Sequence, residues 1–187
     1  MEKKQLRVRL IQERQQLPSR LKHQYDRKIC LAIKSFLDQQ FSELPTLCGF
    51  MSIKGEPDLG PLLEDLVNET RIYLPVLQKQ EMEFWAFQSV GEMKKNQYGI
   101  LEPVTRNLIS RAERCVLLAP CVGISRSGYR LGYGGGYYDK YLAQSRPCAV
   151  VGISYGFAIN QNFKAFDFDI PLDYVISENG LSRFEEE

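Results

Sequence analysis

The sequence predicts an α/β domain in which a mostly parallel sheet is covered by helices on both faces. Segments typical of strands alternate with segments typical of helices along the 187 residues. The central strand-like segments are continuously apolar, which is typical of parallel strands that are buried on both faces. The length fits a single domain, residues 1–187, because one core of this size buries enough surface to be stable.

The first half of the chain begins with two helical segments. Residues 2–16 are dense in Lys, Arg, Gln and Leu and contain neither Gly nor Pro. Pro18 ends this helix, and Ser19 is expected to cap a second helix, in which apolar residues recur at spacings of three and four. The short apolar run at residues 47–53 is expected to be a strand. Asp58 is expected to cap a helix that carries Leu59, Leu62, Leu63, Leu66 and Val67.

The second half contains most of the predicted sheet. Residues 91–107 are polar and are expected to be a connecting loop, followed by a helical turn at residues 108–113. A further helix is expected at residues 137–145, and the last four residues are expected to be a frayed tail. Apolar and aromatic composition predicts strands at residues 71–77, 83–87, 115–119, 149–154 and 174–177.

Charge and hydropathy exclude several classes of protein. The net charge of +1 gives no general attraction to nucleic acid or to an anionic membrane. The longest apolar stretch, residues 115–124, is about half of what a membrane-spanning helix needs, and the first ten residues do not resemble a signal peptide. We therefore expect a cytoplasmic protein with no membrane or nucleic-acid partner, whose five cysteines are reduced and buried.

The single histidine limits the chemistry. His23 lies among charged residues of the second helix and is expected to be solvated. We therefore do not expect a zinc site, a Ser–His–Asp triad or a Cys–His pair. An enzyme with this composition depends on carboxylates, lysines, arginines, tyrosines and backbone dipoles.

The segment GYRLGYGGGYYDKYL, residues 128–142, is the strongest functional signal. Glycines permit a close backbone approach to a ligand, and successive N–H groups before a helix can converge on an anion. Arg130 and Lys140 add full positive charges on either side of the loop. The spacing is neither that of a Walker A loop nor that of the dinucleotide fingerprint. The loop is expected to hold a nucleotide phosphate chain, and the alternative is a flexible turn between strand and helix. The glycines of this loop are Gly132, Gly134, Gly135 and Gly136.

The run RLGYGGGYYDKYL resembles the signature of the 5-formyltetrahydrofolate cyclo-ligases. Four further segments resemble the family in the expected order, so the resemblance covers nearly the whole chain. They are Lys3-x-x-Leu6-Arg7, Gly55-Glu56-Pro57-Asp58, Tyr98-Gly99-Ile100-x-Glu102-Pro103 and Asp173-Tyr174-Val175-Ile176. The resemblance implies a three-layer fold of the NagB/RpiA/CoA-transferase-like type. It also implies the conversion of 5-formyltetrahydrofolate, with ATP and Mg²⁺, to 5,10-methenyltetrahydrofolate, ADP and phosphate.

The same resemblance implies residue roles. Arg130 and Tyr138 would be catalytic, and Asp139 and Asp173 would bind Mg²⁺. The substrate-binding residues would be Met51, Glu56, Tyr98 and Tyr137. The ATP-binding residues would be Lys3, Lys4, Arg7, Arg130, Leu131, Gly132, Tyr133, Gly134, Gly135, Gly136, Tyr137 and Tyr138.

Several of these residues also have a structural interpretation. Lys3 and Arg7, one helical turn apart, would alone be solvated helix charges. Asp173 beside a proline is typical of a turn or cap, Glu56 of an exposed turn, and Met51 of a core strand. Which of the two tyrosines, 137 or 138, meets the folate is left open.

The chain departs from the family pattern at two places. Ile124-Ser125 stands where the family usually has Phe-Asp, and Ala158 stands where a Gln is expected. These departures put substrate contacts in doubt more than the phosphate loop.

Two other functions remain open. One is a phosphate-ligand or nucleotide-binding protein on the same fold without cyclo-ligase activity. The other is an adaptor that binds RNA or a protein through the basic residues 3–14, a reading weakened by the near-zero net charge. The expected partner is a reduced formylated folate, bound by a monomer or weak dimer.

Overall fold

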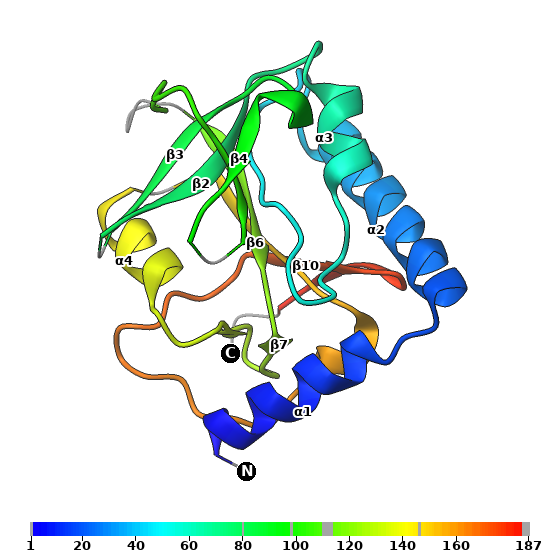
Figure 1. The fold of residues 1–187 in the computed structure, drawn as a ribbon. Coiled ribbons are helices and arrows are strands. Elements are labelled where there is room, and N and C mark those ends of the chain that lie inside the picture. The colour runs from blue at the N-terminus through cyan, green and yellow to red at the C-terminus, as the bar shows by residue number, and fades with distance from the viewer. Residues whose placement is uncertain (1, 80, 98, 110–113, 146, 185–187) are drawn as a thin grey trace.

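A seven-stranded sheet runs through the molecule, and its five inner strands are parallel (Figure 1). The computed structural model describes residues 2–79, 81–97, 99–109, 114–145 and 147–184. The pairing at each edge of the sheet is antiparallel. In spatial order the strands are β11 (Gly180–Arg183), β10 (Tyr174–Ser177), β9 (Ala149–Ile153), β6 (Cys115–Pro120), β1 (Thr46–Cys48), β2 (Ile72–Gln78) and β3 (Glu81–Phe87).

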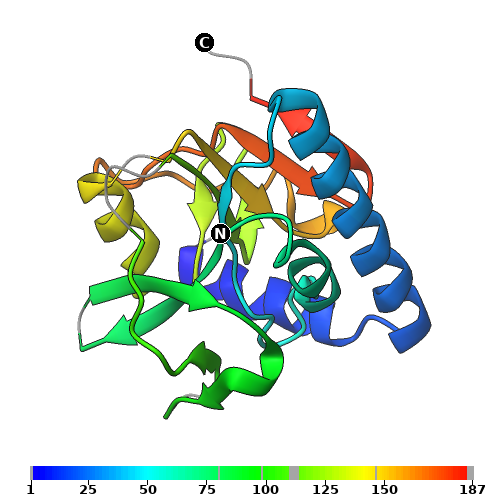
Figure 2. The ribbon, with the colours of Figure 1, turned by 90° about the horizontal axis from the view of Figure 1, so that it is seen from above.

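Helices cover both faces of this sheet, so the predicted layer arrangement is confirmed. Figure 2 shows α2 (Ser19–Gln40) and α3 (Gly60–Leu66) on one side and α4 (Tyr137–Gln144) on the other. Strand β6 explains why its sequence is continuously apolar. Val116 and Leu118 face the α2–α3 core, whereas Leu117 and Ala119 face the core on the α4 side.

Helix α1 (Lys3–Gln15) lies across one end of the sheet (Figure 1). Its Leu6 and Leu10 are buried against Val122, Leu131 and Ala158. These contacts place α1 at the carboxyl end of the central strands, because Val122 and Leu131 follow β6 in the chain. Among the described residues, no helix has both the length and the apolar character required to cross a membrane.

One face of helix α2 carries large apolar side chains that pack into the core between this helix and the sheet. Phe36 is 2% exposed and its ring lies 5.0 Å from that of Tyr174 and 6.1 Å from that of Phe41. Leu31, on the same helix, is 59% exposed. The predicted 3–4 apolar spacing is thus confirmed as the buried face of this helix.

The helix starts differ in detail from the predictions. Ser19 is the first residue of α2 and makes no side-chain cap bond, since the capping position is occupied by Pro18. Helix α3 begins at Gly60, after Leu59. The Asp58 carboxylate nevertheless accepts a hydrogen bond from the Gly60 amide at 3.0 Å.

Two predicted segments are corrected by the structure. The strand expected at residues 47–53 ends at Cys48, because residues 52–56 bond within their own turn, with the Ile53 amide 3.0 Å from the Glu56 carboxylate. Met51 therefore lies in a loop. The loop expected at residues 91–107 contains a hairpin of β4 (Met93–Lys95) and β5 (Leu101–Pro103), closed by a turn at Gly99 with φ +76°.

Further short elements were not predicted. They are the strands β7 (Gly123–Ile124) and β8 (Arg130–Leu131), the 3-10 turns Val90–Glu92 and Gly156–Ala158, and the edge strand β11. The helical turn expected at residues 108–113 and the expected frayed tail lie largely outside the described residues. No disulfide joins the five cysteines, of which Cys48, Cys115 and Cys121 are buried, Cys30 is half-buried and Cys148 is exposed.

Candidate active site

The glycine-rich loop joins β8 to α4 at the carboxyl end of the sheet. Two of its glycines have positive φ, +103° at Gly134 and +66° at Gly136, a conformation that side chains with a Cβ rarely adopt. Gly136 directly precedes the first residue of α4. The loop therefore presents backbone N–H groups and the amino end of a helix at the same place, which suits an anion.

A cavity of about 290 Å³ lies against this loop. One end is built from the loop and the cationic residues Lys3 and Arg7, and it also contains Asp169. The other end is apolar and contains two carboxylates, Glu56 and Glu102. The apolar lining comes from Phe50, Met51, Ile53, Pro75, Leu77, Met82, Ile100, Leu101 and Pro120.

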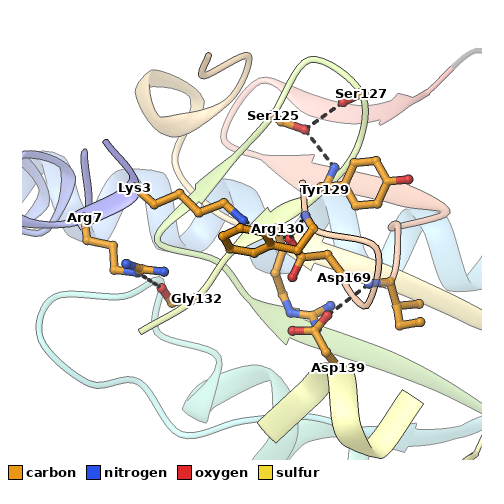
Figure 3. A network of polar contacts seen from close by, with 11 residues as sticks. Lys3, Arg7, Ser125, Ser127, Tyr129, Arg130, Gly132, Asp139 and Asp169 are labelled. Atoms are coloured by element: carbon orange, nitrogen blue, oxygen red, sulfur yellow. Dashed lines mark hydrogen bonds and ion pairs between the residues drawn. The ribbon is translucent and has the colours of Figure 1, made fainter. Parts of the chain in front are cut away.

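Arg130 and Asp139 form a buried ion pair in the cavity wall (Figure 3). The Arg130 Nη2 lies 2.5 Å from the Asp139 Oδ1, which also accepts a hydrogen bond from the Ile170 amide at 3.1 Å. Among the described residues, the Arg130 Nη1 and the Tyr138 hydroxyl are buried without a hydrogen-bond partner. Because buried donors without partners are costly, these two groups are suited to a ligand that accepts hydrogen bonds.

Tyr138 is neutral in this setting. Burial raises the pKa of its phenol well above the usual value, and the nearby Glu56 carboxylate raises it further. The Arg130 guanidinium lies 5.5 Å from the centre of the Tyr138 ring. The tyrosine can therefore donate a hydrogen bond but is unsuited to act as a base near neutral pH.

Helix α1 brings two of the predicted cations to the loop (Figure 3). The Arg7 Nε donates to the Gly132 carbonyl at 2.6 Å, and the Lys3 Nζ lies 2.9 Å from the Asp169 Oδ2. The same ammonium group lies 3.8 Å from the centre of the Phe166 ring. Lys4 points away: its side chain is exposed and it is not among the described residues that line the cavity.

Glu56 is buried, at 1% exposure, and does not lie in an exposed turn. Its Oε1 accepts a hydrogen bond from the Tyr133 hydroxyl at 2.7 Å and its Oε2 accepts one from the Ile53 amide at 3.0 Å. Burial raises the pKa of this carboxyl group, and the charge of Arg14 opposes that rise.

Asp173 is not brought together with Asp139. It directly precedes β10, at the amino end of the parallel strands, and is not among the described residues that line the cavity. Its Oδ2 accepts a hydrogen bond from the Val150 amide at 2.7 Å, while its own amide donates to the Val150 carbonyl at 2.9 Å. The structure thus places Asp173 as a link between β9 and β10, whereas its structural interpretation from the sequence was a turn or cap residue.

Of the other predicted positions, some line the cavity and some do not. Met51 and Tyr137 line the cavity, whereas Tyr98 lies outside the described residues. The departures at Ile124, Ser125 and Ala158 are buried away from the described cavity lining. Ser125 supports the turn between β7 and β8, since its Oγ accepts a hydrogen bond from the Tyr129 amide at 3.0 Å.

Several site residues were missed by sequence reasoning. Arg14 is seven residues after Arg7 and therefore on the same face of α1, a spacing that could have revealed it. Glu102 was assigned no role. Its carboxylate accepts a hydrogen bond from the Leu77 amide at 3.0 Å and so joins the β4–β5 hairpin to the sheet. Phe166, Phe168 and Asp169 lie in an irregular loop without a sequence pattern.

Gly135 is expected to be intolerant of alanine, because an added Cβ would lie 2.7 Å from the Tyr137 ring. The displaced ring packs on the α4-side core, so we expect Gly135→Ala to lower the free energy of unfolding by about 1–3 kcal/mol. Gly132→Ala is the matched control, since its added Cβ has no neighbour within 4 Å. Urea unfolding measures both variants, and equal stabilities would contradict the prediction.

Comparisons with known proteins agree with one another. The sequence profile of the 5-formyltetrahydrofolate cyclo-ligase family matches residues 1–178. The 5-formyltetrahydrofolate cyclo-ligase of Haemophilus influenzae is 28% identical over 178 residues, which are 91% of this chain and 94% of that protein. That of Escherichia coli K12 is 32% identical over 140 residues, 71% of this chain and 77% of the relative.

Two solved structures have the same fold. The NMR structure of 5,10-methenyltetrahydrofolate synthetase from Aquifex aeolicus superposes with a TM-score of 0.85 at 27% identity, and the match covers 100% of this chain and 95% of the other. The 5,10-methenyltetrahydrofolate synthetase from Mycoplasma pneumoniae gives a TM-score of 0.77 at 28% identity, with 95% and 99% covered.

Proposed function

The chain belongs to the 5-formyltetrahydrofolate cyclo-ligase family and is an enzyme of that activity, and we propose that its reaction takes place in the cavity between the glycine loop and α1. In this proposal ATP and 5-formyltetrahydrofolate bind together and leave as ADP, phosphate and 5,10-methenyltetrahydrofolate. The observation that carries the assignment is the buried Arg130, whose Nη1 has no partner among the described residues of the cavity wall.

The cationic end of the cavity suits the ATP phosphates. The loop glycines offer backbone N–H groups, and Arg130 offers a guanidinium fixed by Asp139. Lys3 and Arg7 approach the same loop from α1, so their charges neutralise the phosphates from the opposite side. Lys4 is exposed and is dropped from the set that we propose to touch ATP.

The carboxylates present suit Mg²⁺ only together with the nucleotide. Among the described residues, no group of three or more His, Cys, Asp or Glu side chains is placed to hold a metal ion. Mg²⁺ in phosphate sites commonly uses one or two carboxylates, with phosphate oxygens and waters completing its coordination. We propose that Asp139 is that carboxylate, and that the ion supplies charge neutralisation on the phosphates when bound.

The apolar end of the cavity suits a flat ring system such as the pterin. Phe50, Met51 and Leu77 offer apolar walls there, and Glu56 is the buried carboxylate beside them. An ionised Glu56 can accept hydrogen bonds from the amino and ring N–H groups of a pterin. We propose Glu56 and Met51 as folate-binding residues, with Tyr137 closing the side toward the loop.

The reaction then needs positioning and charge stabilisation rather than a protein nucleophile. The formyl oxygen attacks the γ-phosphorus and the bond to the bridging oxygen breaks, which releases ADP. N10 attacks the activated formyl carbon, the carbon–oxygen bond breaks, and phosphate leaves with the N10 proton. Arg130 stabilises the charge on the transferred phosphoryl group, and the neutral Tyr138 hydroxyl donates a hydrogen bond to it.

We propose that residues 1–187 act as one catalytic domain and that the working form is a monomer or weak dimer. The substrate of the proposed site is a reduced formylated folate.

The direct test mixes the purified protein with 5-formyltetrahydrofolate and MgATP. We expect the near-ultraviolet absorbance of the methenyl product to rise only when the folate, ATP and Mg²⁺ are all present. Asp139→Asn should lose most of the Mg²⁺-dependent rate, whereas Asp173→Asn should change the rate little; the fold of Asp139→Asn is checked by circular dichroism because the change leaves Arg130 without its counter-ion. A rise of equal size without ATP, or equal losses in the two Asp variants, would contradict the proposed site.

A further inference from the structure

Three segments that are distant in the sequence meet in one polar cluster beside the cavity, in which Arg14 and Glu56 are buried and Tyr133 is 39% exposed. Arg14 comes from the last turn of α1, Glu56 from the turn after β1, and Tyr133 from the middle of the glycine loop. Arg14 is 3% exposed and Glu56 is 1% exposed. In the proposed function, Glu56 faces the folate and the glycine loop faces ATP, so this cluster lies where the two substrates meet.

The hydrogen bonds in the cluster have a definite direction. A guanidinium can only donate, so the Arg14 Nη2 donates to the Tyr133 oxygen. The Tyr133 hydroxyl hydrogen is therefore directed away from Arg14, and it is donated to the Glu56 Oε1 at 2.7 Å. The Arg14 Nε donates to the Lys54 carbonyl at 2.8 Å, which fixes the guanidinium to the turn that carries Glu56.

The positive charge of Arg14 also acts on the Glu56 carboxylate. Its Nη2 lies 3.6 Å from the Glu56 Oε1, and its Nη1 is buried without a partner in the described part of the chain. A carboxylate this buried is costly to ionise unless a cation lies close by. The titratable or charged groups that influence Glu56 or are influenced by it are Arg14, Lys54, Tyr133, Tyr138 and Cys121. Lys54 opposes the effect of burial less than Arg14 does.

Resting on the proposed function, we propose that Arg14 is a positioning residue for the reaction, which stabilises the Glu56 carboxylate and holds the Tyr133 hydroxyl against it. The Tyr133 hydroxyl then joins the glycine loop, which we propose to bind ATP, to Glu56, which we propose to bind the folate. Arg14 acts through Glu56 and Tyr133 and needs no contact with either substrate.

The kinetic test compares Arg14→Met with the wild type between pH 6 and pH 9. Without the guanidinium charge, the pKa of Glu56 is expected to rise further, so a smaller fraction of the carboxylate is ionised at pH 7. We expect kcat/KM for 5-formyltetrahydrofolate to fall about 10- to 50-fold at pH 7, through KM more than kcat, and to recover as the pH rises. Arg14→Lys should recover part of the lost kcat/KM, because it restores the positive charge but not the planar guanidinium that donates several hydrogen bonds at once.

Two controls isolate the cluster. Arg9→Met removes an exposed arginine of the same helix, one that bonds only to Gln161 among the described residues, and should leave the pH profile unchanged. In the double variant Arg14→Met/Glu56→Gln, the recovery at high pH should disappear because no carboxylate titrates. The inference would be overturned if Arg14→Met lost the same activity at every pH. It would also be overturned if the double variant still recovered activity at high pH.

A stability measurement decides the inference even if the assay shows no cyclo-ligase activity, which would contradict the proposed function alone. The folded pKa of Glu56 is raised, so the folded state binds more protons above the unfolded pKa of about 4.3, and stability falls as the pH rises through that window. Removing Arg14 raises the folded pKa further. The free energy of unfolding of Arg14→Met should therefore fall more steeply between pH 5 and pH 8 than that of the wild type. Equal slopes would overturn the inference.

Discussion

Replacement of Arg130 by alanine is expected to lower kcat/KM about 10³-fold, the scale of an arginine that stabilises a transferring phosphoryl group. The guanidinium is buried at 7% exposure and is held by Asp139 at 2.5 Å, so it is oriented before any ligand binds. Its Nη1 has no partner among the described residues and lies in the wall of the cavity. An oriented donor of this kind stabilises developing charge without reorganisation, and most of its effect should appear in kcat.

Removal of Arg130 also leaves the Asp139 carboxylate without its cation, so folding must be measured alongside activity. Arg130→Lys keeps the charge and should recover stability more than rate, because an ammonium group lacks the fixed fork. The double variant Arg130→Ala/Asp139→Asn removes both charges and should be more stable than Arg130→Ala, yet no more active. An Arg130→Ala protein that is folded and retains a tenth of the wild-type kcat/KM would contradict the proposed role.

Phe36→Ala is expected to lower the free energy of unfolding by about 3–5 kcal/mol, the usual cost of removing a fully buried phenylalanine ring. The ring lies between α2 and the sheet, with Tyr174 and Phe41 as aromatic neighbours, and none of these elements can close the gap without moving. Because α2 packs against β10 and β11, the cavity left behind would loosen the far edge of the sheet.

The matched control for this change is Leu31→Ala, which shortens an exposed side chain of the same helix. It should alter the free energy of unfolding by no more than about 0.5 kcal/mol, since helix propensity is kept or improved. Urea unfolding followed by circular dichroism measures both variants. A loss below about 1 kcal/mol for Phe36→Ala would show that α2 is not anchored by this ring.

The layers and the parallel central strands could be predicted from apolar patterns in the sequence, whereas the order of the strands in the sheet was not predicted. Continuous apolar runs such as Cys115–Pro120 mark strands buried on two faces, and 3–4 spacing marks α2. The hairpin of β4 and β5 was missed because its strands are three residues long and half polar, and its turn depends on Gly99 and on side-chain bonds of Asn96. Short elements of this kind are fixed by tertiary contacts rather than by periodicity.

The residues that line the cavity were predictable where a motif is contiguous. The segment from Arg130 to Asp139 lies together in sequence and in space, and resemblance pointed to Lys3, Arg7 and Glu56 as well. Asp173 was assigned to the metal by resemblance, whereas its carboxylate joins β9 to β10. The spacing from Arg7 places Arg14 on the same face of α1, but its burial and its contact with Glu56 become visible only once the turn after β1 is placed.

The contact of Lys3 with Asp169 joins residues 166 positions apart, and that of Arg7 with Gly132 joins residues 125 apart. At roughly 5–20 residues per second, the ribosome makes Asp169 about 8–33 s after Lys3. Helix α1 is therefore made long before the residues that its cationic side chains contact. Until those residues are made, neither the cationic side chains of α1 nor its buried Leu6 and Leu10 have the neighbours that they contact in the folded protein.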